Sequence, residues 1–123
     1  MGRHLATIAT ILFMIGMRPV AADFAIAGPG AQSCSVVNAN ATPGRDSSQN
    51  LTTILIFTWA QGYISGLNGA VMNLSPGKRS AWDLERISTE QQWDYIVAYC
   101  NANPSAMIVT AVTSLAAERL FKR

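Results

Sequence analysis

Hydrophobic residues in the second half of the chain recur at the three- and four-residue spacing of a helix. Asn50 is a good N-cap, and the pattern after it predicts a first helix from Leu51 to about Asn68 or Met72. One face of this helix would carry Leu51, Leu55, Trp59, Gly62, Tyr63 and Gly66. Further apolar residues widen the surface well beyond one stripe, which is typical of a central core helix or a membrane span.

Two more amphipathic helices are expected after it. Ser88 and Gln91 have the spacing of a capping box at the start of the second helix. The core-facing stripe of that helix would be Trp93, Ile96, Val97 and Cys100. Asn103 and Pro104 are predicted to end it and to begin the third helix, with Asn as the cap and Pro at the first helical position. The third helix should run to about Phe121 and bury Ile108, Ala111, Val112, Leu115 and Ala116.

The predicted fold class is all-α, a small disulfide-stapled bundle of three main helices with short helical pieces. No stretch alternates between apolar and polar residues as a strand would. Residues 23–50 are rich in Gly, Ser, Asn and Pro, so they are expected to form an irregular N-terminal arm with one short helical turn around Cys34. Residues 51–123 would form the helical core of the same single domain, because about 100 residues support one core.

Residues 1–22 are predicted to be a signal peptide. Arg3 and His4 form a short basic start, the apolar run from Leu5 to Met17 follows, and small residues precede a cleavage site near Ala22. A retained membrane anchor is the alternative, although the run is short for a span of about 20 residues. Export predicts a periplasmic or secreted protein.

Export also predicts a disulfide. Cys34 and Cys100 are the two cysteines of the chain, and an oxidising compartment would join them. Such a bridge closes a loop of about 66 residues and would contribute roughly 4 kcal/mol of stability. Two free, buried thiols are the alternative.

The charge pattern argues against nucleic acid as a partner. Residues 23–123 carry seven basic and seven acidic side chains, so the whole-chain excess of +2 belongs to the leader. A neutral chain with scattered signs has neither a basic stripe for nucleic acid nor a polybasic membrane patch.

The uncharged stretch from Ser47 to Gly77 allows three interpretations. A membrane span would place Gln61 and Asn68 in hydrocarbon, and it would put the two cysteines on opposite sides of the membrane. A phosphate-binding loop would need a Lys and a Ser or Thr that are missing here. A buried core helix is the preferred interpretation.

In that helix, two glycines are expected to have a packing role. Gly62 and Gly66 would let another helix approach closely, with Trp59 and Tyr63 as the walls of the contact. The neighbouring helix would be the one that carries Ala111 and Ala116.

Catalytic chemistry has little support in the sequence. His4 is the single histidine and would leave with the leader, so the exported chain would lack an imidazole. Four carboxylates cluster at Asp83, Glu85, Glu90 and Asp94. Paired carboxylates can cleave glycosidic bonds, but acids at a polar helix start are more typical of a solvated face. We therefore expect no enzyme activity, no metal and no cofactor.

Short motifs in the chain resemble those of a known family. They are Cys34, the stretch Trp59-Ala60-Gln61-Gly62-Tyr63, and Tyr99-Cys100-Asn101-Ala102-Asn103-Pro104, followed by Ala111 on a last amphipathic helix. In this order they look like the small periplasmic HdeA/HdeB-type proteins of proteobacteria. They are also similar to the immunity proteins that neutralise amidase toxins of type VI secretion.

The resemblance implies a non-enzymatic protein-binding function. The HdeA/HdeB-type proteins are stress chaperones, in which acid loosens the fold or the dimer and exposes apolar surface to unfolding client proteins. Partners would be such clients or a toxin, and a homodimer is compatible with the family. Protonating seven carboxylates would bring the neutral exported chain near +7 and favour opening. An immunity protein and a structural envelope protein are the alternatives.

Overall fold

The described part of the chain is helical. The computed structural model describes residues 25–41, 50–75, 77 and 81–122, and within these ranges it has two isolated β-bridges and no strand. In chain order the elements are a 3-10 helix η1 (Gly28–Ala31), α1 (Cys34–Asn40), α2 (Leu51–Leu74), α3 (Thr89–Ala102), α4 (Ile108–Leu115) and a π-helical turn η3 (Ala116–Leu120). The all-α prediction is confirmed. The predicted signal peptide, residues 1–22, lies outside the described residues.

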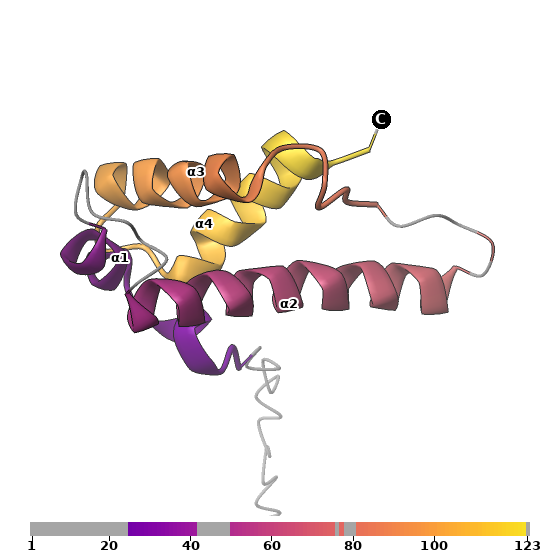
Figure 1. Ribbon diagram of the computed structural model, residues 1–123. Coiled ribbons are helices and arrows are strands. Elements are labelled where there is room, and N and C mark those ends of the chain that lie inside the picture. Colours follow the sequence, from indigo (N-terminus) through magenta and orange to yellow (C-terminus); the bar gives the residue numbers. More distant parts are fainter. Residues whose placement is uncertain (1–24, 42–49, 76, 78–80, 123) are drawn as a thin grey trace, which may run out of the picture.

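α4 crosses between α2 and α3, which run in opposite directions along two sides of the bundle (Figure 1). α1 lies at the end of the bundle where α2 begins and α3 ends, and it packs mainly against α3. Beyond Ile64, α2 buries no residue. Its last ten residues, roughly 15 Å of helix, extend past the other helices.

The hydrophobic core lies where these helices meet. α4 and η3 supply the largest share, and the predicted core residues of this last helix are all buried. α2 adds Ile56, Ala60 and Ile64, while α3 adds Ile96 and Cys100. The buried core residues of α4 and η3 are Ile108, Val109, Ala111, Val112, Leu115, Ala116 and Leu120.

Two helix starts lie where their capping residues predict. The Asn50 side chain accepts hydrogen bonds from the backbone N–H groups of Thr52 and Thr53, at 3.0 and 3.4 Å. Ser88 and Gln91 form the reciprocal capping box at the start of α3. These bonds satisfy backbone donors that the first turn of a helix otherwise leaves unpaired.

The prediction for Pro104 is wrong. α3 ends at Ala102 with Asn103 as its C-cap, but α4 begins at Ile108, four residues after Pro104. The carbonyls of Pro104 and Ala106 accept hydrogen bonds from the backbone N–H groups at residues 35 and 34. This pairing with the first residues of α1 holds the segment in turns and a bridge, so the last helix starts later than the proline suggests.

The predicted face of α2 is wrong in part: Trp59 and Tyr63 pack against the core, but the fully buried side of the helix is a different one. Its buried positions are Thr53, Ile56, Ala60 and Ile64, whereas Leu51, Leu55, Gly62 and Gly66 from the predicted face are exposed. Neither face of α2 carries a charge and both include apolar side chains, so the hydrophobic pattern of the sequence does not show which face is buried.

None of the helices within the described ranges combines the length and apolar character needed to cross a membrane.

Candidate functional site

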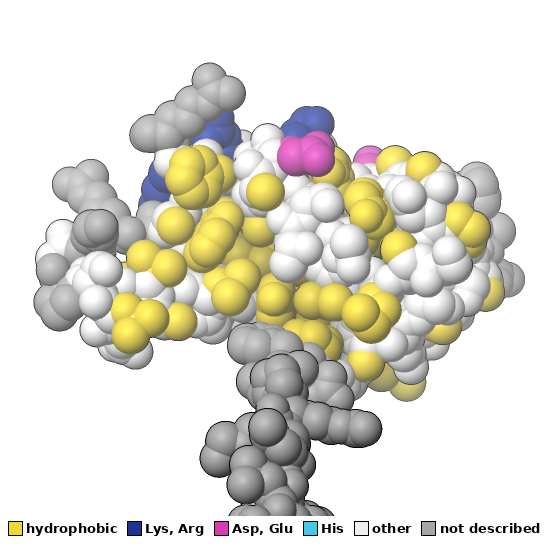
Figure 2. Space-filling model, turned by 180° about the vertical axis from the view of Figure 1, so that it is seen from behind, with side chains coloured by type: hydrophobic (Ala, Val, Ile, Leu, Met, Phe, Trp, Pro, Cys, Tyr) yellow, Lys and Arg dark blue, Asp and Glu magenta, His cyan; other side chains and the backbone are white. Residues whose placement is uncertain are grey.

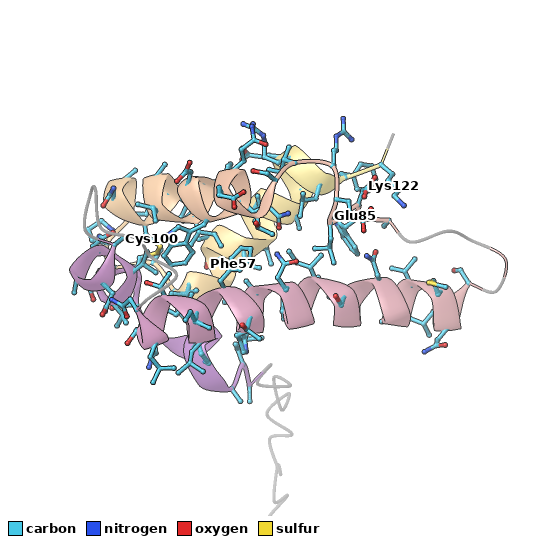
Figure 3. The ribbon with its side chains drawn as sticks, viewed as in Figure 1. Phe57, Glu85, Cys100 and Lys122 are labelled. Atoms are coloured by element: carbon cyan, nitrogen blue, oxygen red, sulfur yellow. A yellow bond between two sulfur atoms is a disulfide. The ribbon has the colours of Figure 1, made fainter. Side chains whose placement is uncertain are left out.

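The predicted disulfide is present. Cys34 and Cys100 are bonded to each other, their Cα atoms are 4.8 Å apart, and both side chains are fully buried. The bond joins the first residue of α1 to the last turn of α3 across 66 positions of sequence. Asn38 adds a hydrogen bond to the Cys100 carbonyl at 3.0 Å, so the two helices are fixed to each other at this end (Figure 3).

The close backbone approach in this molecule occurs at Gly30, not at Gly62 or Gly66. A Cβ added at Gly30 would lie 2.0 Å from the Trp59 indole, whereas one added at Gly62 or Gly66 would meet nothing within 4 Å. Trp59 stacks on Tyr63 with ring centroids 5.1 Å apart. The prediction of a helix packed on Gly62 and Gly66 is therefore wrong: the two aromatic side chains face η1 and the bundle instead.

The outward side of α2 forms an uncharged surface, which we call the outer face. It follows one stripe of the helix, and all its members are exposed. They are Leu51, Ile54, Leu55, Thr58, Gly62, Ser65, Gly66, Met72 and Asn73. Apolar side chains continue over the back of the bundle, where the charged side chains in view gather near the upper edge (Figure 2).

Amide side chains connect α2 to the rest of the fold, and sequence reasoning did not assign them this role. Gln92 is fully buried; its Nε2 donates to the Leu84 and Ile87 carbonyls, and its Oε1 accepts from Gln61 at 2.6 Å. From the sequence, Gln61 and Asn68 were expected only to oppose membrane insertion. Their position within an uncharged and largely apolar helix was the available signal for a polar contact.

Asn68 forms the second amide connection. Its side chain donates to the Trp82 carbonyl at 2.9 Å and accepts from the Trp82 backbone N–H at 3.0 Å. The same short segment pairs with the last residue of η3: the Asp83 N–H donates to the Leu120 carbonyl at 2.8 Å. The segment after α2 is thereby held between α2 and the C-terminal end.

A groove lies between the first part of α2 and the start of α3. Its volume is about 330 Å³. Each helix contributes pairs of residues one turn apart. The lining residues are Thr53, Ile54, Phe57 and Thr58 from α2, and Thr89, Glu90, Trp93 and Asp94 from α3. Phe57 and Trp93 meet edge to face, with ring centroids 6.3 Å apart, and Figure 3 shows Phe57 between the two helices.

Thr53 is the unusual residue of this groove. It is only 4% exposed, and its hydroxyl has no hydrogen-bond partner among the described residues. Its backbone N–H is used by the Asn50 cap, so its position in α2 is fixed by the start of the helix. A buried hydroxyl without a partner destabilises a fold and calls for an explanation.

The charges at the groove are negative. The Glu90 carboxyl accepts hydrogen bonds from backbone and from Ser88 and Thr89 at the helix start, which lowers its pKa below the ordinary value of 4.5. Asp94 follows one turn later and is also exposed. None of the described residues that line the groove is basic. In the described ranges, no three His, Cys, Asp or Glu side chains come together to hold a metal ion.

Comparison of the chain with protein families, curated proteins and solved structures finds no match.

Proposed function

We propose that this is an exported protein-binding protein that holds unfolding proteins, in the manner of HdeA/HdeB-type stress chaperones. The observation that supports it best is the outer face of α2. Its apolar members Leu51, Ile54 and Leu55 lie together at the start of this helix and are 68%, 42% and 53% exposed. Exposed apolar patches of this kind are typical of protein interaction surfaces.

The distribution of acidic groups supports acid as the trigger. Asp83, Glu85, Glu90 and Asp94 all belong to the segment that contacts α2 through Trp82, Gln92 and Trp93. Protonation removes the negative charge from this segment while its basic groups and the rest of the chain stay positive. α2 carries no charge, so the resulting repulsion acts between the charged segments around it. Loosening of residues 81–94 would break their contacts with α2, which would then separate.

The disulfide defines what would remain folded. It fixes α1 to α3, and α4 packs against α3, whereas the described contacts of α2 with the other helices are packing and side-chain hydrogen bonds. Release of α2 would add its buried side chains, Ile56, Ala60 and Ile64, to the apolar surface that clients can contact. A disulfide is also typical of compartments outside the reducing cytoplasm, which supports the proposed export to the periplasm.

The test measures whether the oxidised 23–123 chain suppresses the aggregation of unrelated acid-sensitive proteins, at pH 2–3 and at pH 7. We expect suppression at the acidic pH only, with a parallel rise in apolar-dye binding. Leu51→Ser with Leu55→Ser should reduce suppression, whereas Met107→Gln, which changes a residue that is 50% exposed before α4, should not. Equal suppression by all three proteins, or none at either pH, would contradict the proposal.

The same assay separates the alternatives. An immunity protein would bind one amidase toxin at neutral pH and leave unrelated proteins to aggregate. A structural envelope protein would do neither, and its helical signal would not change between pH 7 and pH 3.

A further inference from the structure

We infer that the groove between α2 and α3 binds a small organic cation with an apolar body, such as an arylalkyl ammonium ion. This site borders the proposed chaperone surface, since Ile54 and Thr58 belong to both, but ligand binding in the groove does not depend on client binding. Three features carry the inference: the size of the groove, the polarity of its rim and the unpartnered hydroxyl in its wall.

The size of the groove fits a small ligand. Its volume of about 330 Å³ is at the lower end of the range of small-molecule sites, roughly 300–1,000 Å³. Phe57 and Trp93, in edge-to-face contact, provide aromatic surface for an apolar body of about one ring and a short chain. A large cofactor would not fit.

The acidic side chains at the rim of the groove favour a positively charged ligand. Glu90 and Asp94 lie one helical turn apart on the same wall, and no described lining residue opposes them with a positive charge. An ammonium group at this edge would be attracted by two carboxylates, whereas a carboxylate ligand would be repelled. Since both acids are exposed, each should strengthen binding only about two- to fivefold.

Thr53 supplies the third feature, on the opposite wall. Its hydroxyl lacks a partner although the residue is almost fully buried. The hydroxyl is itself covered, so contact with a ligand requires the side chain to turn about its Cα–Cβ bond and exchange hydroxyl and methyl. The new hydrogen bond would satisfy a group that the protein alone leaves unpaired.

The experiment is an NMR titration of the oxidised chain with 2-phenylethylammonium, followed through the indole N–H signal of Trp93. 2-Phenylethanol and 3-phenylpropionate are the neutral and anionic comparison ligands. We expect the cation to bind at least fivefold more tightly than the alcohol, and to lose affinity as NaCl rises from 20 to 500 mM. Equal affinity for cation and alcohol would overturn the inference.

Variants assign the contacts. Glu90→Gln with Asp94→Asn should weaken cation binding about tenfold, whereas Glu85→Gln, an exposed acid outside the groove, should leave it unchanged. Thr53→Val keeps the shape of the side chain, so it should stabilise the free protein and weaken binding about fivefold. Full affinity in the double acid variant would overturn the inference, and full affinity in Thr53→Val would overturn the role of the hydroxyl. Client aggregation is a separate measurement, so failure here leaves the chaperone proposal standing.

Discussion

The space around each glycine determines whether the fold tolerates a side chain at that position. Gly30 is buried beneath the Trp59 ring, where a Cβ has no room, and Gly28, two residues before it, has a positive φ of 73°. Gly62 lies on the outer face of α2 with open space around it. The same substitution should therefore have opposite effects at the two positions.

We predict that Gly30→Ala destabilises the protein by roughly 1–3 kcal/mol, because the rigid indole must move out of its stacked position. Gly62→Ala is the matched control and should stabilise α2 by about 0.5–1 kcal/mol through higher helix propensity. Denaturant unfolding at neutral pH measures both. A neutral Gly30→Ala would show that η1 does not pack on Trp59 in solution.

Tyr95 makes the stability sensitive to alkali. Burial, followed by its hydrogen bond to Glu118, raises the pKa of the phenol from 10.0 to about 12. A raised pKa in the folded state means that the stabilising contribution is complete below pH 10 and is lost as the pH rises through 12.

We predict that Tyr95→Phe, which has no phenol to ionise, loses less stability than the parent protein between pH 10 and 12. Unfolding midpoints across this range give the comparison, and the phenolate absorbance of the two proteins identifies the residue that titrates. Parallel stability curves would contradict the assignment.

Helical elements here were predictable at their starts and poorly predictable in their orientation. Asn50 and the Ser88–Gln91 pair act within one turn, so sequence alone located the beginnings of α2 and α3. The inward face of α2 depends on where α4 and η1 pack, and the uncharged sequence of α2 offered no contrast between its faces. The groove combines residues about 35 positions apart, so no local pattern revealed it.

Gln92 is the point at which α2, α3 and the segment before α3 depend on one another. We predict that Gln92→Leu destabilises the protein by roughly 2–4 kcal/mol, because it leaves the Leu84 and Ile87 carbonyls and the Gln61 amide without their partner.

Gln61→Leu is the informative comparison for this prediction. It removes one of the three hydrogen bonds of Gln92 and should cost about 1 kcal/mol. Hydrogen exchange should show faster opening of α2 in both variants. Equal stability of Gln92→Leu and the parent protein would mean that packing alone fixes α2.

At the scale of the whole molecule, the disulfide offsets the small size of the core. Cys34→Ser with Cys100→Ser should lower the unfolding free energy by roughly 4 kcal/mol, since the bond closes a 66-position loop in the unfolded chain. Thermal unfolding of the oxidised protein, the reduced protein and the double variant measures this. A change below 1 kcal/mol would indicate that the unfolded chain is already compact at this loop.

Because α2 lies within the loop that the disulfide closes, proteolysis after α2 would leave the two fragments covalently linked. Both ends of α2 lie between Cys34 and Cys100, and the sequence places a tryptic site, Lys78-Arg79, between α2 and α3. A molecule cleaved there consists of two polypeptides that a single sulfur bridge keeps together. It would migrate as one species on a non-reducing gel and as two after reduction, so backbone scission by itself would not let the fragments diffuse apart.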